Sequence, residues 1–262
     1  MDRKISFYKY HGTGNDFILL DQMENEFDLT TQEIADLCHR RFGIGADGLM
    51  MLRKAEGYDF EMVYYNSDGN RSTMCGNGGR CIVKFAFDLG YIGNSSSFLA
   101  VDGPHKAVVK GDEVELGMID VDKVTQIEVD NVYELFTGSP HYVKYIGKEA
   151  DLDEIVQVGK SVRYSPVYLD EGINVNLVFE NGNSQIHMAT YERGVEDETY
   201  SCGTGVTAAA ISQALKRDLN EEVFVKTKGG NLSVTFDRLD DKFTHVILKG
   251  PALFVFKGEV SI

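Results

Sequence analysis

Cys75-Gly76-Asn77-Gly78 and Cys202-Gly203-Thr204-Gly205 are two versions of one short signature, and each begins a stretch with apolar residues at helical spacing. The chain has 27 Gly among 262 residues, so a given Cys precedes Gly-x-Gly by chance about one time in a hundred. Two of the four cysteines do so. The pattern predicts two long helices that start alike, with apolar faces that include Ile82, Phe85, Ala86 and Leu89 before Gly90, and Val206, Ala209, Ala210, Ala214 and Leu215.

Strand-like segments surround both signatures. They cover residues 5–10, 17–21, 60–65, 173–179, 185–191, 223–227, 232–236, 245–248 and 253–256. Asn181-Gly182 carries the commonest signal for a two-residue hairpin turn, and Gly229-Gly230 predicts a similar hairpin.

Two shorter helices complete the pattern. Thr30 and Glu33 form a capping box, and Gly43 is expected to end that helix. Residues 151–160 fit a third, short helix. The order of strands, helix and strands then repeats, which predicts an α+β protein in two halves of roughly equal length.

Composition and charge restrict the classes of partner and the location that we expect for the protein. The formal net charge of −15 disfavours nucleic acid and anionic membranes as partners and favours small molecules. No apolar stretch is long enough to span a membrane, and the N-terminus lacks the apolar region of a secretory signal. Four cysteines are too few for a disulfide scaffold, so we expect a cytoplasmic protein with free thiols.

A thiol at a helix N-terminus is favoured as a thiolate by the unpaired N–H groups and the helix dipole. Backbone N–H groups at Gly76, Asn77, Gly203 and Thr204 can hold an oxyanion. If both helix N-termini face one cleft, a thiolate and a thiol flank a substrate carbon. This arrangement suits removal of a proton next to a carboxylate and return of a proton from the opposite side.

Other interpretations of the signature are weaker. Cys75 and Cys81, with His141 or Cys202, could complete a metal site, but no Cys-x(2–4)-Cys pair is present. Redox exchange lacks a Cys-x-x-Cys motif, and no nucleotide-binding Gly-rich loop occurs. The glycines could also form tight helix starts with incidental cysteines. Cys38 and Cys81 lie in apolar helical patterns and are expected to be small buried hydrophobes.

The chain resembles the diaminopimelate epimerase family across nearly its whole length. The matching segments occur in the family's order: residues 10–17, 41–48, 66–69, 74–78, 140–141, 172–175, 192–194, 201–205 and 250–252. The resemblance implies two pseudo-symmetric halves, each a mostly antiparallel sheet wrapped around a central helix, with the active site between them. The halves would be residues 1–119, completed by the C-terminal strand 252–262, and residues 120–251.

The resemblance also implies the activity. The family interconverts LL- and meso-2,6-diaminopimelate without metal or other cofactor, for lysine and peptidoglycan precursor biosynthesis. The implied partner is a small amino-acid substrate, and a homodimer is expected.

Family membership implies that Cys75 and Cys202 are the two catalytic bases. The resemblance implies two groups of substrate contacts. The distal, non-reacting end would be held by Asn15, Asn66, Asn174 and Arg193, and the reacting ammonium group would be contacted by Glu192 and His141. Independently of the resemblance, the backbone N–H groups described above add the helix starts, Gly76, Asn77, Gly203 and Thr204.

Some positions depart from the family pattern. Ser139 stands where an Asn that helps to bind the distal carboxylate usually precedes Pro-His, Asn70-Arg71 replaces Ser-Glu, and Ala189 replaces an Arg. These changes touch the distal pocket rather than the thiols. They keep open a related racemase or epimerase acting on proline, hydroxyproline or histidine, and, from another class, a binding protein for acidic small molecules.

Overall fold

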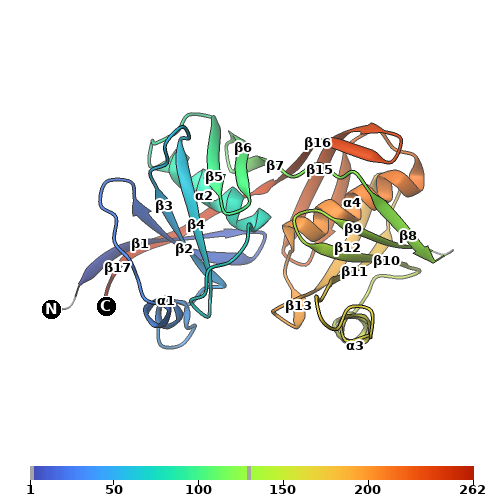
Figure 1. Ribbon diagram of the computed structural model, residues 1–262, viewed down its shortest axis with the longest axis horizontal. Helices are drawn as coiled ribbons and strands as arrows, with labels where there is room; N and C mark the ends of the chain where they lie inside the picture. The colour runs from blue at the N-terminus through green and yellow to red at the C-terminus, as the bar shows by residue number, and fades with distance from the viewer. Residues whose placement is uncertain (1–2, 129–130) are drawn as a thin grey trace. The chain divides into compact units, whose positions relative to one another are not determined.

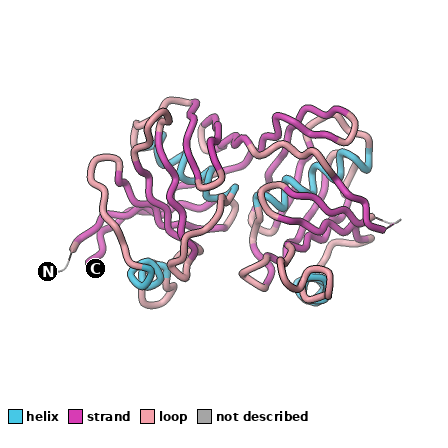
Figure 2. Tube along the Cα trace, viewed as in Figure 1, coloured by secondary structure: helices cyan, strands magenta, loops and turns pink. Residues whose placement is uncertain are grey.

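The computed structural model describes residues 3–128 and 131–262. It divides the chain into two compact units, one formed by Met1–Leu116 with Pro251–Ile262 and the other by Gly117–Gly250. Four helices and seventeen strands are assigned within the described residues. Figure 2 shows that strands dominate each unit.

The first unit is a mixed, mostly antiparallel sheet. Strand β1 pairs antiparallel with both β2 and β17, β2 runs parallel to β3, β3 antiparallel to β4, and β4 parallel to β5. Antiparallel β5–β6 and β6–β7 pairs follow. The strands are β1 Lys4–Gly12, β2 Asn15–Gln22, β3 Gly48–Arg53, β4 Phe60–Asn66, β5 Ser95–Ala100, β6 Gly103–Lys110, β7 Glu113–Gly117 and β17 Leu253–Ser261.

Helix α2, Gly76–Asp88, is the central helix of this unit (Figure 1). It contacts β1, β2, β3, β6 and β17, and its residues from Gly76 to Ala86 are all buried. A helix buried on every side needs small residues where the sheet comes close. An added Cβ at Gly79 would lie 2.4 Å from the side chain of Met74 and 2.9 Å from that of Leu116. The predicted start after Cys75 is confirmed, and the helix ends at Asp88, just before Gly90.

Helix α1, Thr31–Cys38, has the predicted capping box, with both hydrogen bonds between Thr30 and Glu33 present. The predicted end at Gly43 is wrong, because the helix stops at Cys38. The chain folds back over its last turn, where Gly43 N–H donates to the carbonyl of His39. An added Cβ at Gly43 would lie 2.0 Å from the carbonyl oxygen of Asp36, so glycine is required for this close approach.

The second unit repeats the pairing order of the first. Strand β9 pairs antiparallel with β8 and β10, β10 is parallel to β11, β11 antiparallel to β12, and β12 parallel to β14. Antiparallel β14–β15 and β15–β16 pairs follow. The strands are β8 Val124–Glu128, β9 Val132–Phe136, β10 Pro140–Ile146, β11 Asn174–Glu180, β12 Gln185–Glu192, β13 Asp197–Thr199, β14 Val223–Thr227, β15 Gly230–Leu239 and β16 Lys242–Pro251.

Helix α4, Gly203–Arg217, occupies in this unit the place of α2 and is buried from Gly203 to Ala214. Helix α3, Leu152–Arg163, packs on the other face of β11 and β12. Strand β11 is therefore covered on both faces, with Leu177 in the cluster beneath α3 and Val178 in the cluster around α4. The equal pairing orders and the two central helices make the fold α+β with two pseudo-symmetric halves.

The turn between β11 and β12 differs from its prediction. Four residues separate Glu180 from Gln185, and Asn181 N–H donates to the carbonyl of Gln185. The loop is held from outside, because Gln213 Nε2 donates to the Asn183 carbonyl at 2.7 Å. The connection is therefore a four-residue loop held by a long-range contact, and not the predicted two-residue turn. No helix within the described residues has the length and apolar character needed to cross a bilayer.

Candidate active site

Cys75 and Cys202 occupy the same place in their units, as the N-cap residue of the central helix. Their backbone angles are nearly equal, with φ −119° and ψ 120° at Cys75 and φ −118° and ψ 113° at Cys202. Neither side chain caps its helix, so each sulfur is available for other contacts. Cys75 is half-buried and Cys202 is buried.

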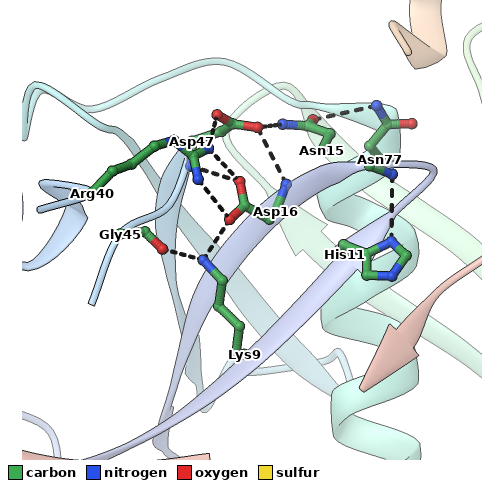
Figure 3. Close-up of polar contacts among 9 residues, drawn as sticks. Lys9, His11, Asn15, Asp16, Arg40, Gly45, Asp47 and Asn77 are labelled. Atoms are coloured by element: carbon green, nitrogen blue, oxygen red, sulfur yellow. Dashed lines mark hydrogen bonds and ion pairs between the residues drawn. The ribbon is translucent and has the colours of Figure 1, made fainter. Parts of the chain in front are cut away.

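In the first unit, the contacts of Cys75 lead to the hairpin between β1 and β2. The sulfur donates to Oδ1 of Asn15 at 3.7 Å, and Nδ2 of Asn77 donates to the same oxygen at 3.3 Å. On its other side, Asn15 Nδ2 donates to a carboxylate oxygen of Asp47 at 2.7 Å. Figure 3 shows Asn15 between Asp47 and Asn77. Three of the predicted site residues therefore meet at the start of α2.

Asp47 belongs to a network of charged groups (Figure 3). Arg40 lies 2.6 Å from carboxylate oxygens of both Asp47 and Asp16, and Lys9 is 2.6 Å from Asp16. Lys9 also donates to the carbonyl of Gly45. Although burial raises the pKa of Asp16, hydrogen bonds from Arg40 and Lys9 outweigh it and bring that pKa to about 2. The hairpin that carries Asn15 is thus tied to the loop after α1.

Arg80, one turn into α2, is the largest fully buried side chain, with 0% exposure. Its guanidinium donates to Oδ1 of Asn77 at 3.0 Å, to the Gly76 carbonyl at 3.3 Å and to the Thr13 hydroxyl at 3.4 Å. No carboxylate among the described residues is within ion-pair distance of it. Burial lowers the pKa of Arg80 to about 10, opposed in part by negative charge on Cys81 or Cys75. Arg80 therefore remains a cation at neutral pH.

In the second unit, Cys202 contacts the hydroxyl of Thr204, whose Oγ1 is 3.4 Å from the sulfur. The same oxygen is 2.9 Å from Nε2 of His141 and 3.0 Å from Oγ of Ser139. His141 is fully buried, and burial, together with the nearby charge of Arg193, lowers its pKa to about 3. The His141 ring is therefore neutral at neutral pH.

The neighbours of His141 fix its tautomer. Nδ2 of Asn176 lies 3.1 Å from His141 Nδ1 and 3.1 Å from the carbonyl oxygen of Tyr142. An amide NH2 group can only donate, so Nδ1 accepts and the ring proton is on Nε2. That proton is directed to the hydroxyls of Ser139 and Thr204, each 2.9 Å away.

The hydroxyl protons then have an assignment that gives every donor an acceptor. Asn174 Nδ2 donates to Ser139 Oγ at 3.2 Å, and Asn174 Oδ1 accepts from the N–H of Arg193 at 2.9 Å. Ser139 donates to Thr204 Oγ1. In this assignment Thr204 Oγ1 accepts from Ser139 and from the ring, and the Thr204 proton is directed to the sulfur of Cys202; either atom can be the donor in both hydroxyl contacts.

The two clusters, one in each unit, correspond closely. Asn15 and Ser139 each lie at the start of equivalent strands, β2 and β10, and each contacts the second residue of the central helix, Asn77 or Thr204. The chemistry differs between them: the sulfur of Cys75 contacts an amide oxygen, whereas that of Cys202 contacts a hydroxyl that is bonded in turn to a neutral imidazole.

Asn66 and Glu192 lie at strand ends of their units, and Arg193 joins the second cluster through its backbone N–H and its charge. Asn66 is exposed at the end of β4, and its backbone N–H donates to the carbonyl of Asn70. Glu192 is half-buried at the end of β12. The exposed guanidinium of Arg193 donates to the carbonyl of Glu171 at 2.8 Å.

Sequence reasoning missed several residues of the network. Asn176 is fully buried, and the only available signal was a polar residue inside an apolar strand. Asp47 lies in a matched family segment, and Arg80 is a charged residue on an apolar helix face. Cys38 and Cys81 are buried as predicted, and burial raises the pKa of both thiols. Across the described part of the chain, no three His, Cys, Asp or Glu side chains are grouped to hold a metal ion.

Comparison with known proteins places the chain in a family. The family model described as diaminopimelate epimerase matches residues 7–127 and 134–255. The chain is 47% identical over 259 residues to the diaminopimelate epimerase of Flavobacterium psychrophilum, covering 98% of this chain and 100% of that protein. It is 39% identical to the diaminopimelate epimerase of Chlorobaculum tepidum, covering 96% and 99% of the two chains.

Solved structures share the fold at low sequence identity. A phenazine biosynthesis protein of the PhzF family from Bacillus anthracis has a TM-score of 0.75 at 13% identity, covering 99% of this chain and 100% of that one. A hydroxyproline epimerase from Agrobacterium vitis has a TM-score of 0.71 at 13% identity, covering 99% and 93%. The family match and the two full-length relatives establish that the chain belongs to the diaminopimelate epimerase family and is an isomerase.

Proposed function

We propose that the protein interconverts LL- and meso-2,6-diaminopimelate by a two-base mechanism without a cofactor. Cys75 and Cys202 are the two bases. One, as a thiolate, removes the α-proton, and the other, as a thiol, protonates the opposite face of the carbanion. The roles exchange in the reverse direction. The observation that carries this proposal is the equal placement of the two thiols as N-cap residues of equivalent helices.

Each cysteine must be stable in both protonation states for the roles to exchange. At Cys75, Oδ1 of Asn15 accepts a hydrogen bond from the thiol form, while the buried charge of Arg80 favours the thiolate form. At Cys202, the hydroxyl of Thr204 can accept from the thiol form and donate to the thiolate form, because either atom can be the donor in this contact. The helix dipole adds to the thiolate preference at both sites.

The carbanion is the high-energy species in this reaction. The backbone N–H groups at the first turns of α2 and α4 are suited to hold the substrate carboxylate as it gains negative charge. The N–H groups belong to Gly76, Asn77, Gly203 and Thr204. Each well-placed oxyanion donor contributes about 3 kcal/mol to stabilisation of the transition state.

The remaining predicted residues are assigned to substrate binding. Asn15, Asn66, Asn174 and Arg193 would hold the distal amino-acid end, with Ser139 as a further polar contact there. Glu192 would contact the reacting ammonium group. His141 would also contact the ammonium group. Its complete burial supports a second role, in which it orients the hydroxyl of Thr204.

The biological setting is part of the proposal. The reaction belongs to the synthesis of lysine and of peptidoglycan precursors, and the enzyme would act in the cytoplasm as a homodimer. Its substrate is a small amino acid rather than a nucleic acid or a membrane.

Deuterium incorporation tests the proposal. The purified protein is incubated in D2O with LL-diaminopimelate, without added metal or pyridoxal phosphate and in the presence of a chelator. We expect one α-deuterium to appear in the meso product. L-Proline, trans-4-hydroxy-L-proline and L-histidine serve as matched substrates. Exchange at one of these and none at diaminopimelate would assign the enzyme to another amino acid, and no exchange at any would contradict epimerase activity.

A further inference from the structure

A hydrogen-bond chain in the first unit begins and ends at side chains with a fixed hydrogen-bond character. At one end, the guanidinium of Arg80 has donors and no acceptor. At the other end, the ionised carboxylate of Asp47 has acceptors and no donor. Two amides, Asn77 and Asn15, lie between them, linked by contacts of 3.0, 3.3 and 2.7 Å.

The two ends determine how both amides are turned. An amide side chain can be rotated by half a turn at little steric cost, which exchanges its oxygen and its nitrogen. Arg80 requires the oxygen of Asn77 on its side, so the Asn77 nitrogen faces Asn15. Asp47 requires the nitrogen of Asn15, so the Asn15 oxygen faces Asn77 and Cys75. Both requirements agree, and the chain runs in one direction from the cation to the carboxylate.

We propose that Asp47 is a positioning residue that fixes the orientation of the Asn15 amide, so that Asn15 presents its oxygen to Cys75 and a fixed donor pattern to the substrate. The part of this inference that concerns substrate rests on the proposed function. Arg80 is the second anchor. Arg40 lies outside the chain, because it binds the other oxygen of Asp47 and leaves the contact with Asn15 intact.

The surroundings favour a specific role for Asp47 over that of a surface ion pair. Asp47 Oδ2 accepts from two donors of the hairpin, Nδ2 of Asn15 and the backbone N–H of Asp16 at 3.2 Å. Asn77 and Arg80 are 1% and 0% exposed, so water is excluded from the inner end of the chain. A reversed Asn15 amide would place its NH2 group against the carboxamide nitrogen of Asn77 and leave Asp47 facing an oxygen.

The test compares Asp47→Asn with Arg40→Gln. Asp47→Asn is nearly isosteric but gives position 47 both a donor and an acceptor, so the Asn15 amide is free to turn. Loss of one hydrogen bond to a charged group corresponds to about tenfold in affinity. We expect the KM for diaminopimelate to rise about tenfold with a smaller fall in kcat. Arg40→Gln removes the ion pairs with Asp47 and Asp16 but keeps the Asp47 acceptor for Asn15, so KM should stay within about twofold of the wild-type value.

A second readout needs no substrate. Alkylation of Cys75 by iodoacetamide, followed by peptide mass spectrometry over a pH series, gives a midpoint for ionisation of this thiol. A turned Asn15 amide presents N–H donors to the sulfur, so Asp47→Asn should lower the midpoint by about one pH unit. Apart from the carboxylate that Asp47→Asn removes, the charged and titratable groups that interact with this thiol, Arg80 and Cys81, are the same in the wild type and the variants.

The outcomes separate the alternatives. If Arg40→Gln raises the midpoint as far as Asp47→Asn lowers it, net charge and not amide orientation acts on Cys75, and the inference is overturned. Equal losses of thermal stability in both variants, with unchanged KM and midpoint, also overturn it. If the wild type shows no epimerase activity but the midpoint shifts in Asp47→Asn alone, the proposed function fails and the positioning role stands.

Discussion

Nε2 of His141 lies 2.9 Å from Oγ1 of Thr204, so a buried neutral imidazole donates to the hydroxyl that itself contacts the sulfur of Cys202. The ring is held in this tautomer by Asn176. His141 is therefore suited to orient a hydroxyl rather than to transfer a proton, because its low pKa keeps the ring from becoming protonated at neutral pH.

Removal of the Thr204 hydroxyl tests this arrangement. Thr204→Val preserves the shape of the side chain but deletes the donor to Cys202. A hydrogen bond to a charged group contributes about 1.5–3 kcal/mol, so we expect kcat to fall about 10- to 100-fold. Thr204→Ser keeps the hydroxyl and should retain most of the activity. Steady-state kinetics in both directions provide the measurement, and equal losses in the two variants would argue against the hydroxyl.

The thiols themselves allow a direct test of the two-base mechanism. Cys75→Ala and Cys202→Ala should each abolish epimerisation, because each removes one of the two groups that exchange the proton. A Cys→Ser variant could still exchange the α-proton of one stereoisomer with solvent. Circular dichroism controls for folding. Near-wild-type turnover in either alanine variant would contradict the mechanism.

The sequence revealed those parts of the molecule that depend on local chemistry. The Cys-Gly-x-Gly signatures located both central helices, and the capping box located the start of α1, since caps involve residues only three positions apart. The end of α1 was misplaced because Gly43 serves a fold-back over the last helical turn rather than helix termination.

The polar networks could not be predicted in the same way. Asn176 reaches His141 across two adjacent strands, and Asp47 reaches Asn15 from a loop 32 residues away in sequence. Neither pairing leaves a periodic pattern. Family resemblance supplied the residues named for substrate contact, but the side chains that orient them became visible only in three dimensions.

Burial of His141 predicts a pH dependence of stability. Its pKa is lowered from 6.5 to about 3 in the folded chain, so between these values the unfolded chain binds a proton that the folded chain does not. The free energy of unfolding therefore falls as the pH drops below about 6.5, by up to about 1.4 kcal/mol per pH unit. The contribution of the neutral, buried His141 ring to the free energy of unfolding is fully present above pH 6.5.

Urea unfolding at pH 4.5–7 of the wild type and of His141→Gln provides the measurement. We expect the variant to be less stable at pH 7 and the difference between the two proteins to shrink as the pH falls. His245→Gln is the control, because it removes a histidine whose side chain is 82% exposed. A difference that stays constant with pH would show that His141 is not neutral in the folded protein.

The third residues of the two central helices, Gly78 and Gly205, give a matched pair for packing. An added Cβ at Gly78 would lie 2.4 Å from Cε of Met50, the far end of a flexible side chain that can move. At Gly205 it would lie 2.6 Å from Oδ1 of Asn176 and 3.4 Å from the sulfur of Cys202. Asn176 cannot yield without releasing His141, because its amide is bonded on both sides.

Gly205→Ala should therefore destabilise the protein by about 1–3 kcal/mol, as overpacking of a core does, and should also lower kcat by displacing the donor chain to Cys202. In Gly78→Ala, movement of Met50 and the better helix propensity of alanine offset the crowding, so its stability should remain within about 1 kcal/mol of the wild type. Thermal unfolding and turnover of both variants check the pair. Since the two positions are equivalent in the repeated architecture, an equal effect at both would mean that helix geometry, and not the Asn176 contact, makes glycine necessary at Gly205.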